Sequence, residues 1–297
     1  MRMPKQADRM SGTSMHLVIV EGNHEKLVQW DASGNITGAA EHYAACLKSL
    51  WPGLSCSVTR PHFEHDPAPK PDLAACDGVV FTGAGVHWSA DDALAKPARD
   101  IMEQAFALGK PVFGSCYGLQ LGAVVLGGRV GANPNGPELA IARQIELRDA
   151  GRTHPLYAGK PEQFDALCMH RDDVLEAGSA LTVLSHNSHC GIQAVVSADA
   201  STPEFWGVQY HPELRFSDIA RYIKRSEVAG FSQTEALEKS LYCRIESLEQ
   251  LISDLHILAE DEPSSELVHK YQLEDTLISR PVHEQELINW LNLISAS

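Results

Sequence analysis

The chain has 297 residues, of which 24 are basic and 39 acidic, so its formal net charge is −15. Nucleic acids and anionic membranes attract clusters of Lys and Arg, so neither is expected as a partner of this acidic chain. With 44% apolar and 21% charged residues, the composition argues against disorder across most of the chain. The length predicts one core with an appended segment.

The N-terminal segment, residues 1–15, is polar and contains no long apolar stretch, so it is predicted to be flexible and not a secretory signal. The longest apolar runs are far shorter than the roughly 18 residues that a membrane span needs. Seven cysteines at irregular spacings, with no Cys-x-x-Cys pair, indicate reduced thiols and not a disulfide framework or a zinc site. We therefore expect a cytoplasmic protein.

Short apolar runs alternate with helix-like stretches in the first half of the chain. In chain order the predicted elements are strand 16–20, helix 39–50, strand 54–59, strand 78–81, helix 91–108, strand 111–114 and helix 119–126. This alternation predicts an α/β fold, in which a mostly parallel central sheet carries helices on both faces. Functional residues are then expected at the carboxyl ends of the strands.

The pattern changes in the second half, first to strands separated by turns and then to helices. The predicted strands are 139–147, 181–185, 191–196 and 205–210, and the predicted helices are 215–225, 233–260 and 281–295, with a break at 261–265. Between 237 and 258, Leu and Ile recur at three- and four-residue steps, which indicates an amphipathic helix. This stripe either packs onto its own domain or docks a synthetase subunit or a second copy of the chain, and the pattern leaves both open.

The most specific segment is Gly114-Ser115-Cys116-Tyr117-Gly118, between a predicted strand and a predicted helix. A cysteine between two glycines at this place has the form of a nucleophile elbow, where a tight turn presents the side chain. The positive end of the following helix would favour the thiolate. A small buried cysteine without chemistry is the competing interpretation, and the local pattern does not decide between them.

A second segment, Tyr210-His211-Pro212-Glu213, ends a predicted strand. A cysteine nucleophile needs a base, and the base needs a group that orients its other ring nitrogen. His211 and Glu213 can supply both roles if the proline turn brings the carboxylate back to the imidazole. Taken alone, His-Pro-Glu is more often a surface turn.

Together the two segments resemble the class I, or triad, glutamine amidotransferases. Gly114-x-Cys116-x-Gly118-x-Gln120 is similar to that family's nucleophile motif, and Tyr210-His211-Pro212-Glu213 to its base motif. The resemblance covers about residues 16–226 and is greatest to stand-alone proteins similar to the glutaminase domain of GMP synthetase. It implies a flavodoxin-like amidotransferase domain over 16–226, with 227–297 as a helical C-terminal extension.

The resemblance also implies roles for individual residues. Cys116 would attack the γ-carboxamide of glutamine to form a γ-glutamyl thioester and release ammonia, His211 would act as the base, and Glu213 would orient it. The oxyanion would be held by backbone N–H groups, drawn from Gly83, Ala84, Gly85 and Tyr117.

Three further positions are similar to the family's substrate-binding residues, namely Gln120, His170 and Asp172. Met169 replaces a small polar residue of that segment, which leaves the identity of the substrate less secure than the chemistry. No cofactor or metal is implied. The histidine-rich stretch 61–66 is interpreted as a solvated loop, the turn 186–190 as a polar turn more readily than a pocket wall, and His87-Trp88 equally as a cover of the site or as packing.

Three functions follow from these patterns. The first is a glutaminase whose ammonia passes to a separate synthase, because no phosphate-binding loop is present for activating a substrate. The second is a γ-glutamyl amide hydrolase that acts on an amide other than glutamine. The third is a catalytically quiet regulatory module that binds through its helical tail, and the intact Cys116, His211 and Glu213 argue against it. The helical tail is also a candidate surface for forming a homo-oligomer.

Overall fold

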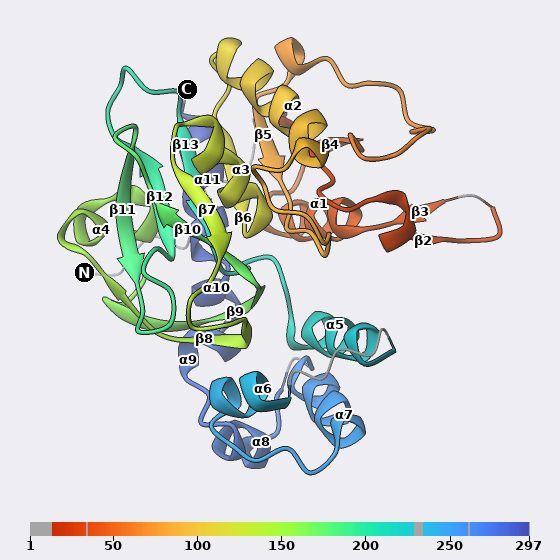
Figure 1. Ribbon diagram of the computed structural model, residues 1–297, viewed down its shortest axis with the longest axis vertical. Coiled ribbons are helices and arrows are strands. Elements are labelled where there is room, and N and C mark those ends of the chain that lie inside the picture. Colours follow the sequence, from red (N-terminus) through yellow and green to blue (C-terminus); the bar gives the residue numbers. More distant parts are fainter. Residues whose placement is uncertain (1–13, 34, 229–233, 261, 297) are drawn as a thin grey trace.

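The protein folds around one mixed β-sheet. The computed structural model describes residues 14–33, 35–228, 234–260 and 262–296. Nine strands form the sheet in the order β4-β1-β5-β6-β13-β12-β11-β8-β9 (Figure 1). The first five strands of this order pair in parallel and the remaining ones pair antiparallel. This arrangement confirms the predicted α/β class with a helical C-terminal region.

The parallel half contains five short strands, of which all but the edge strand β4 are buried along most of their length. They are β1 (His16–Val20), β4 (Ser55–Thr59), β5 (Gly78–Phe81), β6 (Val112–Ser115) and β13 (Phe205–Val208). Because helices cover both faces of a parallel sheet, its strands need continuous apolar runs, which explains why sequence patterns located them within about two residues. Their carboxyl ends bring the segments that follow β5, β6 and β13 to one edge.

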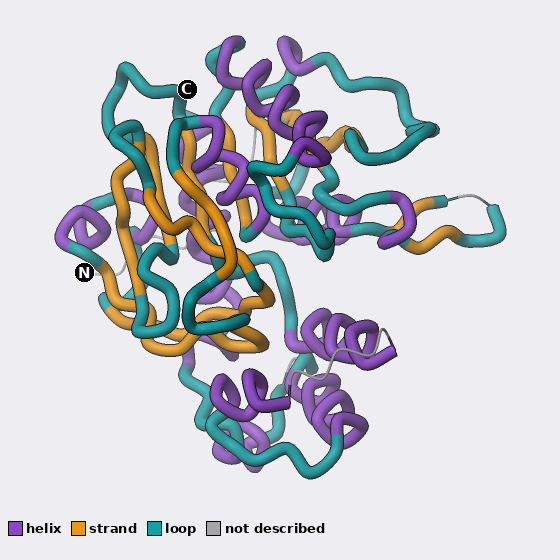
Figure 2. The backbone as a smooth tube through the Cα atoms, viewed as in Figure 1, coloured by secondary structure: helices purple, strands orange, loops and turns teal. Residues whose placement is uncertain are grey.

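Helices α1 (Ala39–Leu50) and α11 (Gln285–Ser295) cover one face of this half, and α2 (Lys96–Ala107) and α3 (Tyr117–Val125) cover the other (Figure 2). The first core contains buried residues of β1, β5, β6, α1 and α11, among them Leu17, Ile19, Tyr43, Val80, Phe113, Trp290 and Leu291. The second contains Val18, Val79, Phe81, Met102, Val112, Leu119 and Phe205. The last helix of the chain is therefore part of the sheet's own core.

The antiparallel half and its neighbours form the second part of the molecule. Its strands are β8 (Glu138–Leu147), β9 (Gln163–His170), β11 (Leu181–His186) and β12 (Ala194–Ser197). The short pairs β7 (Arg129–Ala132) with β10 (Asp172–Glu176) and β2 (Gln29–Trp30) with β3 (Ile36–Thr37) stand beside the sheet, and α4 (Asp149–Thr153) follows β8. Sequence patterns missed β9 and both pairs, because polar residues interrupt β9 and the pairs are short.

The described part of the C-terminal segment consists of helices joined by turns. Its helices are α5 (Phe216–Val228), α6 (Thr234–Leu241), α7 (Leu248–Leu258), α8 (Ser265–Lys270), α9 (Asp275–Ile278), α10 (Arg280–His283) and α11. The single helix predicted over 233–260 is wrong, because α6 ends before α7 begins. Tyr242 takes a left-handed φ of 53°, and the Ser247 side chain caps the start of α7.

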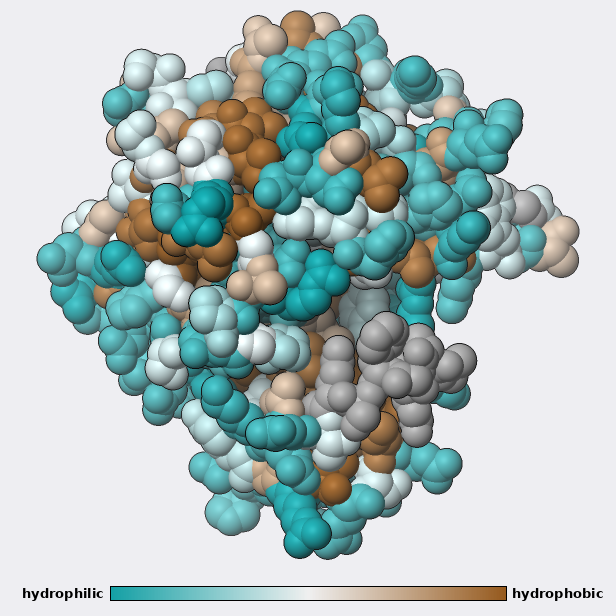
Figure 3. All heavy atoms as spheres, in the orientation of Figure 1, coloured by the Kyte–Doolittle hydropathy of each residue, from teal (hydrophilic) through white to brown (hydrophobic). Residues whose placement is uncertain are grey.

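The apolar stripe of the tail packs inside the chain. A third core joins Leu237, Leu241, Leu251, Leu255 and Leu258 to Leu139, Ile141 and Leu167 of β8 and β9. On the face shown in Figure 3, brown apolar side chains gather over the strands at the left, and α6–α8 at the bottom present mostly hydrophilic ones. Packing onto its own chain is thus what this stripe does in the structure.

Two further sequence expectations concern the whole chain. Every one of the seven cysteines is a free thiol. Among the described residues, no helix is long and apolar enough to cross a membrane. The expected flexible N-terminus falls largely outside the described residues, which begin at 14.

The role of α11 in the core can be tested by truncating Trp290. This side chain is fully buried, and its ring lies directly against Gly78 of β5. We expect Trp290→Ala to lower the free energy of unfolding by about 3–5 kcal/mol, since it leaves a large cavity. Asn292→Ala on the exposed side of the same helix should cost less than about 0.5 kcal/mol in the same urea titration. Equal effects of the two changes would show that α11 is not a core helix.

Candidate active site

Cys116 occupies a strained turn between β6 and α3. Its φ of 51° and ψ of −104° lie in a region that residues with a side chain rarely adopt. The turn is held because the Cys116 N–H donates to the Val208 carbonyl at 2.7 Å, which ties the end of β6 to the end of β13. The side chain is 4% exposed at the start of α3. This is the geometry that the elbow motif predicts.

The two glycines of the motif are required by close approach of the backbone. A Cβ on Gly114 would collide with the main chain of Gly118, and a Cβ on Gly118 would collide with the Phe81 carbonyl. The turn therefore packs directly against the ends of β5 and β6, where no side chain fits. This packing explains why small residues flank the cysteine.

His211 and Glu213 form the expected pair beside Cys116. The Nδ1 atom of His211 lies 2.7 Å from Oε1 of Glu213, and its ring and the Cys116 side chain both lie against Gly83. The His211 N–H donates to the Leu167 carbonyl of β9 at 2.7 Å. The three predicted triad residues are thus brought together, although 95 positions separate the cysteine from the histidine in the sequence.

The charge of His211 is set by these neighbours. Burial acts against the charged imidazolium, but the Glu213 carboxylate and the hydrogen bonds to Cys116 and Glu213 outweigh it and raise the pKa of His211 to about 10. A base in this position must hold the proton that the cysteine gives up. An imidazolium between the cysteine sulfur and a carboxylate is suited to that role.

Ser115 and Tyr43 support the far oxygen of Glu213. The Ser115 hydroxyl donates to Oε2 of Glu213 at 3.1 Å, and the Tyr43 hydroxyl lies 2.9 Å from the Ser115 oxygen. Because Ser115 uses its one proton on Glu213, Tyr43 is the donor in the second bond. The sequence motif assigned no role to Ser115, although a hydroxyl beside the nucleophile was the available signal.

The loop after β5 faces the triad from the opposite side. A Cβ on Gly83 would lie 2.5 Å from Cε1 of His211 and 3.5 Å from Cβ of Cys116, so only a glycine fits there. The Gly85 N–H already donates to Oδ1 of Asn23 at 2.8 Å. Of the loop residues predicted to supply the oxyanion hole, Gly85 therefore has its N–H engaged, whereas Gly83 lies against His211 and Cys116.

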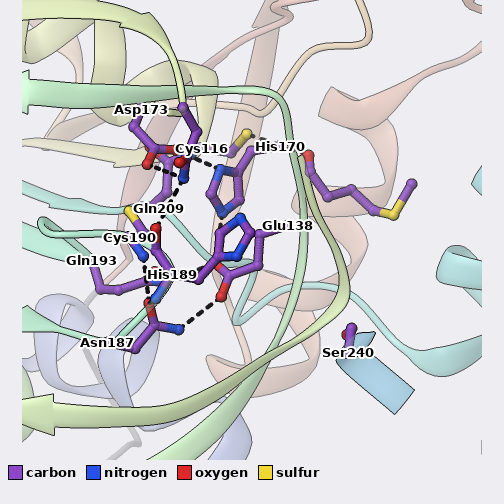
Figure 4. Close-up of polar contacts among 12 residues, drawn as sticks. Cys116, Glu138, His170, Asp173, Asn187, His189, Cys190, Gln193, Gln209 and Ser240 are labelled. Atoms are coloured by element: carbon purple, nitrogen blue, oxygen red, sulfur yellow. Dashed lines mark hydrogen bonds and ion pairs between the residues drawn. The ribbon is translucent and has the colours of Figure 1, made fainter. Parts of the chain in front are cut away.

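His170 is enclosed in a buried ionic group beneath the site (Figure 4). Its Nε2 lies 2.9 Å from Glu138 and its Nδ1 lies 2.8 Å from Asp173, and the imidazole has no exposed surface. Asn187 and Gln193 donate to Glu138 at 2.7 and 2.9 Å. The side chain of His170 is thus positioned to hold the chain around it and has no free surface for a substrate.

The charges of this group are strongly coupled. Burial lowers the pKa of a histidine, but the hydrogen bonds and charges of Asp173 and Glu138 raise the pKa of His170 to about 10. Burial alone would raise the pKa of Glu138, and its bonds to His170, Asn187 and Gln193 instead hold that pKa below its usual range. The group therefore contains a histidinium between two carboxylates.

The same residues are spaced as metal ligands. Donor atoms of Glu138, Cys168 and His170 all lie within 4.8 Å of one another. Both nitrogens of His170 already face carboxylates, and burial raises the pKa of the Cys168 thiol well above its usual range. A metal would have to displace both protons and this hydrogen bonding, so the donor set fits a buried ionic network better than a metal centre.

Gln120 and Asp172 connect the elbow helix to the segment after β9. The Gln120 side-chain amide donates to the Asp172 carbonyl at 2.6 Å, and the Sγ atom of Cys116 lies 3.7 Å from the Met169 carbonyl. The carboxylate of Asp172 pairs with Arg171 through both oxygens, at 2.8 and 3.1 Å. The predicted substrate segment therefore lies beside the nucleophile, with its main chain nearest to the sulfur.

Trp88 and several histidines gather beside the loop that faces the triad. The Trp88 N–H donates to the Tyr117 hydroxyl at 3.1 Å, and its ring centroid lies 5.0, 5.5 and 6.3 Å from those of His87, His62 and His24. Burial and the nearby His24 lower the pKa of His62 to about 4, so its ring is neutral. The stretch 61–66 thus contributes a ring to this cluster, whereas sequence reasoning interpreted it as a solvated loop.

Comparisons with known proteins agree with this geometry. Residues 40–228, well over half of the chain, match the sequence profile of the family described as "Glutamine amidotransferase class-I". The chain belongs to this family. A solved glutamine amidotransferase from Thermotoga maritima matches over 96% of this chain and 100% of its own, with a TM-score of 0.62 at 16% identity, which shows that this class I amidotransferase shares its fold.

Two curated relatives have specific names. A "Gamma-glutamyl-L-1-hydroxyisopropylamide hydrolase" from a Pseudomonas species is 36% identical over 172 residues, which are 55% of this chain and 57% of the relative. A GMP synthase (glutamine-hydrolyzing) from Lactobacillus delbrueckii is 27% identical over 184 residues, which are 61% of this chain and 33% of the synthase. The amidotransferase thus spans less than two thirds of the length of either relative.

The buried histidinium predicts how the stability of this amidotransferase depends on pH. An unfolded histidine loses its proton near pH 6.5, whereas folded His170 loses it near pH 10, as does His211. Between these values the folded state binds protons that the unfolded state has released. The free energy of unfolding should therefore fall as pH rises, by up to about 1.4 kcal/mol per pH unit for each group.

His170→Gln should lower stability at pH 7 and flatten the decline between pH 8 and 10, as measured by urea unfolding at several pH values. His62→Gln is the matched control, because His62 is already neutral throughout this range. An unchanged slope in His170→Gln would show that His170 does not carry the charge.

Proposed function

We propose that this amidotransferase hydrolyses γ-glutamyl amides through a covalent thioester on Cys116, and that glutamine is its amide substrate. The observation that carries the proposal is the placement of His211 beside Cys116 at Gly83, with the His211 Nδ1 atom 2.7 Å from the Glu213 carboxylate. Membership of the class I family supports the same chemistry. A nucleophile, a base and an orienting carboxylate are the parts that acyl transfer requires.

In the first half of the reaction, His211 holds the thiol proton and the Cys116 sulfur attacks the γ-carbonyl carbon. The carbonyl oxygen becomes an oxyanion, for which the N–H groups of Tyr117, Gly83 and Ala84 are the proposed donors. As the C–N bond breaks, His211 gives its proton to the leaving nitrogen. Ammonia departs and the γ-glutamyl group remains on sulfur as a thioester.

In the second half, His211 takes a proton from water, and the resulting hydroxide attacks the thioester carbon. The C–S bond breaks, His211 returns the proton to Cys116, and glutamate leaves. Glu213 stays ionised and stabilises the imidazolium in both halves, while the Ser115 hydroxyl keeps that carboxylate in place.

Gln120, His170 and Asp172 are proposed to shape the site for the amino acid end of the substrate. Gln120 holds the Asp172 carbonyl, and enclosed His170 holds the chain between Met169 and Asp173. In this proposal His170 acts by positioning the segment, whereas Asp172 remains a candidate contact for the α-ammonium group.

The proposed fate of the ammonia is transfer to a separate synthase. The sequence has no phosphate-binding loop for activating an acceptor, and a relative is named as a glutamine-hydrolyzing GMP synthase. A cytoplasmic location and self-association through the tail remain predictions. A quiet regulatory module is the weaker proposal, because Cys116, His211 and Glu213 are assembled in bonding geometry.

A second candidate is hydrolysis of an N-substituted γ-glutamyl amide. The Pseudomonas relative is named for such an amide. The cluster around Trp88 lies beside Tyr117, the residue after the nucleophile, and would meet the amine part of a substituted substrate. Aromatic rings attract apolar and cationic amines, whereas ammonia needs no such surface.

The nucleophile can be tested directly. Cys116→Ala should abolish hydrolysis of glutamine, because no thioester can form, and rapid quenching of the unmodified enzyme should yield a γ-glutamyl adduct on the Cys116 peptide. Cys243→Ala is the matched control, since this partly exposed thiol in the tail is remote from the triad and its loss should leave activity unchanged. Residual turnover in Cys116→Ala would exclude the mechanism.

The two candidate substrates are distinguished by comparing kcat/KM for glutamine and for γ-glutamyl isopropylamide. If the second candidate holds, Trp88→Ala should lower kcat/KM for the substituted amide about tenfold more than for glutamine, the effect of losing one aromatic contact. His65→Ala, an exposed histidine of the same loop region, should affect neither substrate. Equal losses for both substrates in Trp88→Ala would assign Trp88 to packing and leave glutamine as the favoured amide.

A further inference from the structure

We infer that the C-terminal helices α10 and α11 position the catalytic turn 211–213, and that Glu286 and His283 are its positioning residues. This inference deepens the proposed function and rests on it for the role of the triad. Both residues lie beyond residue 228, where the match to the family ends. The segment beyond the family match is thus part of the proposed active-site support.

Glu286 holds the turn by contacting Tyr210, the residue directly before His211. The Tyr210 hydroxyl donates to Oε1 of Glu286 at 2.6 Å, and both side chains are fully buried. Lys160 donates to Glu286 at 2.8 Å and is 1% exposed, so the carboxylate is locked between an ammonium and a phenol. A buried carboxylate fixed at two points leaves Tyr210, and the backbone of His211 after it, little freedom to move.

His283 holds the same turn by contacting Leu214, the residue directly after Glu213. Its Nε2 lies 2.9 Å from the carbonyl of Leu214, directly after Glu213. Burial and the nearby Lys160 lower the pKa of His283 to about 3, so the ring is neutral and its Nε2–H donates to that carbonyl. The adjacent helices α10 and α11 therefore contact the turn on both sides.

The two contacts act on a pair whose geometry matters for reactivity. From the sheet side, the Leu167 carbonyl accepts a hydrogen bond from the His211 backbone, and the Ser115 hydroxyl donates one to Glu213. Glu213 also lines a groove of about 660 Å³ together with Arg280 and Glu284 of the tail, so this side of the triad borders the tail and not the sheet.

The chain provides a matched control for this arrangement. In the tail, the Tyr271 hydroxyl donates to buried Asp254 at 2.6 Å, and Lys270 pairs with the same carboxylate at 2.6 Å. This tyrosine, carboxylate and lysine repeat the Tyr210, Glu286 and Lys160 group, but without a link to the triad. Loss of the tyrosine hydroxyl should lower the stability of the fold alike at Tyr210 and Tyr271. It should change the reactivity of Cys116 only at Tyr210.

The experiment compares Tyr210→Phe with Tyr271→Phe in the full chain. Iodoacetamide alkylation of Cys116, followed by mass spectrometry of its peptide, reports on the thiol and its base without reference to any substrate. Tyr210→Phe should lower the alkylation rate at pH 7 and kcat for glutamine about tenfold, with KM within about twofold, because small displacements of catalytic groups have large effects on rate. It should also move the half-maximal alkylation to higher pH. Tyr271→Phe should change neither rate by more than about twofold.

His283 provides a second, independent pair of variants. His283→Leu should lower alkylation in the same way, and His283→Gln, which keeps a donor for the Leu214 carbonyl, should restore it. Normal alkylation profiles in Tyr210→Phe and His283→Leu, with denaturation midpoints lowered as in Tyr271→Phe, would overturn the inference and leave these contacts purely structural. Altered profiles in an enzyme that hydrolyses no γ-glutamyl amide would instead overturn the proposed function and retain the positioning role.

Discussion

The close approach of backbone at the elbow is the constraint on which the rest of the site depends. Cys116 adopts a left-handed φ because Gly114 and Gly118 let β6 and α3 meet with no side chain between them. The cost of that conformation, of the order of 1–3 kcal/mol, is sustained by the packing of both elements in the core. In return the sulfur is held at the carboxyl ends of the parallel strands, where His211 and the loop at Gly83 converge on it.

Several separate contacts likewise fix the base side of the proposed triad, His211 and Glu213. The Glu213 carboxylate, the Tyr210 hydroxyl and the backbone of His211 and Leu214 each have separate partners, which come from β6, the tail and β9. Beneath it, the histidinium at His170 holds the chain that follows β9. Two positively charged imidazoles with pKa values near 10 thus lie in one buried region and are compensated by three carboxylates, Glu138, Asp173 and Glu213. Rigid placement of charge of this kind limits reorganisation during a reaction.

The tail changes how the amidotransferase domain is understood in this chain. The sequence division at residue 226 separates a domain from an extension, and that division remains a proposal. The packing is continuous across it, since Trp290 and Leu291 lie in the same core as Leu17 and Phe113. The leucines of α6 and α7 cover β8 and β9. A helix that fills the core of a sheet is not free to serve as a separate docking module.

The sequence by itself determined the α/β class and most strands of the parallel half, and it predicted Cys116, His211 and Glu213 as the triad, whose catalytic role remains a proposal. Each of these follows from local information: buried parallel strands are continuous apolar runs, and a strained elbow needs its own glycines. Only the tertiary structure decided which groups support the triad. Tyr210 and Glu286 are 76 positions apart, and Ser115 and Glu213 are 98 apart. Periodicity shows that a side chain is buried, but not which distant polar atom it meets, because that partner is chosen by the packing of the whole chain.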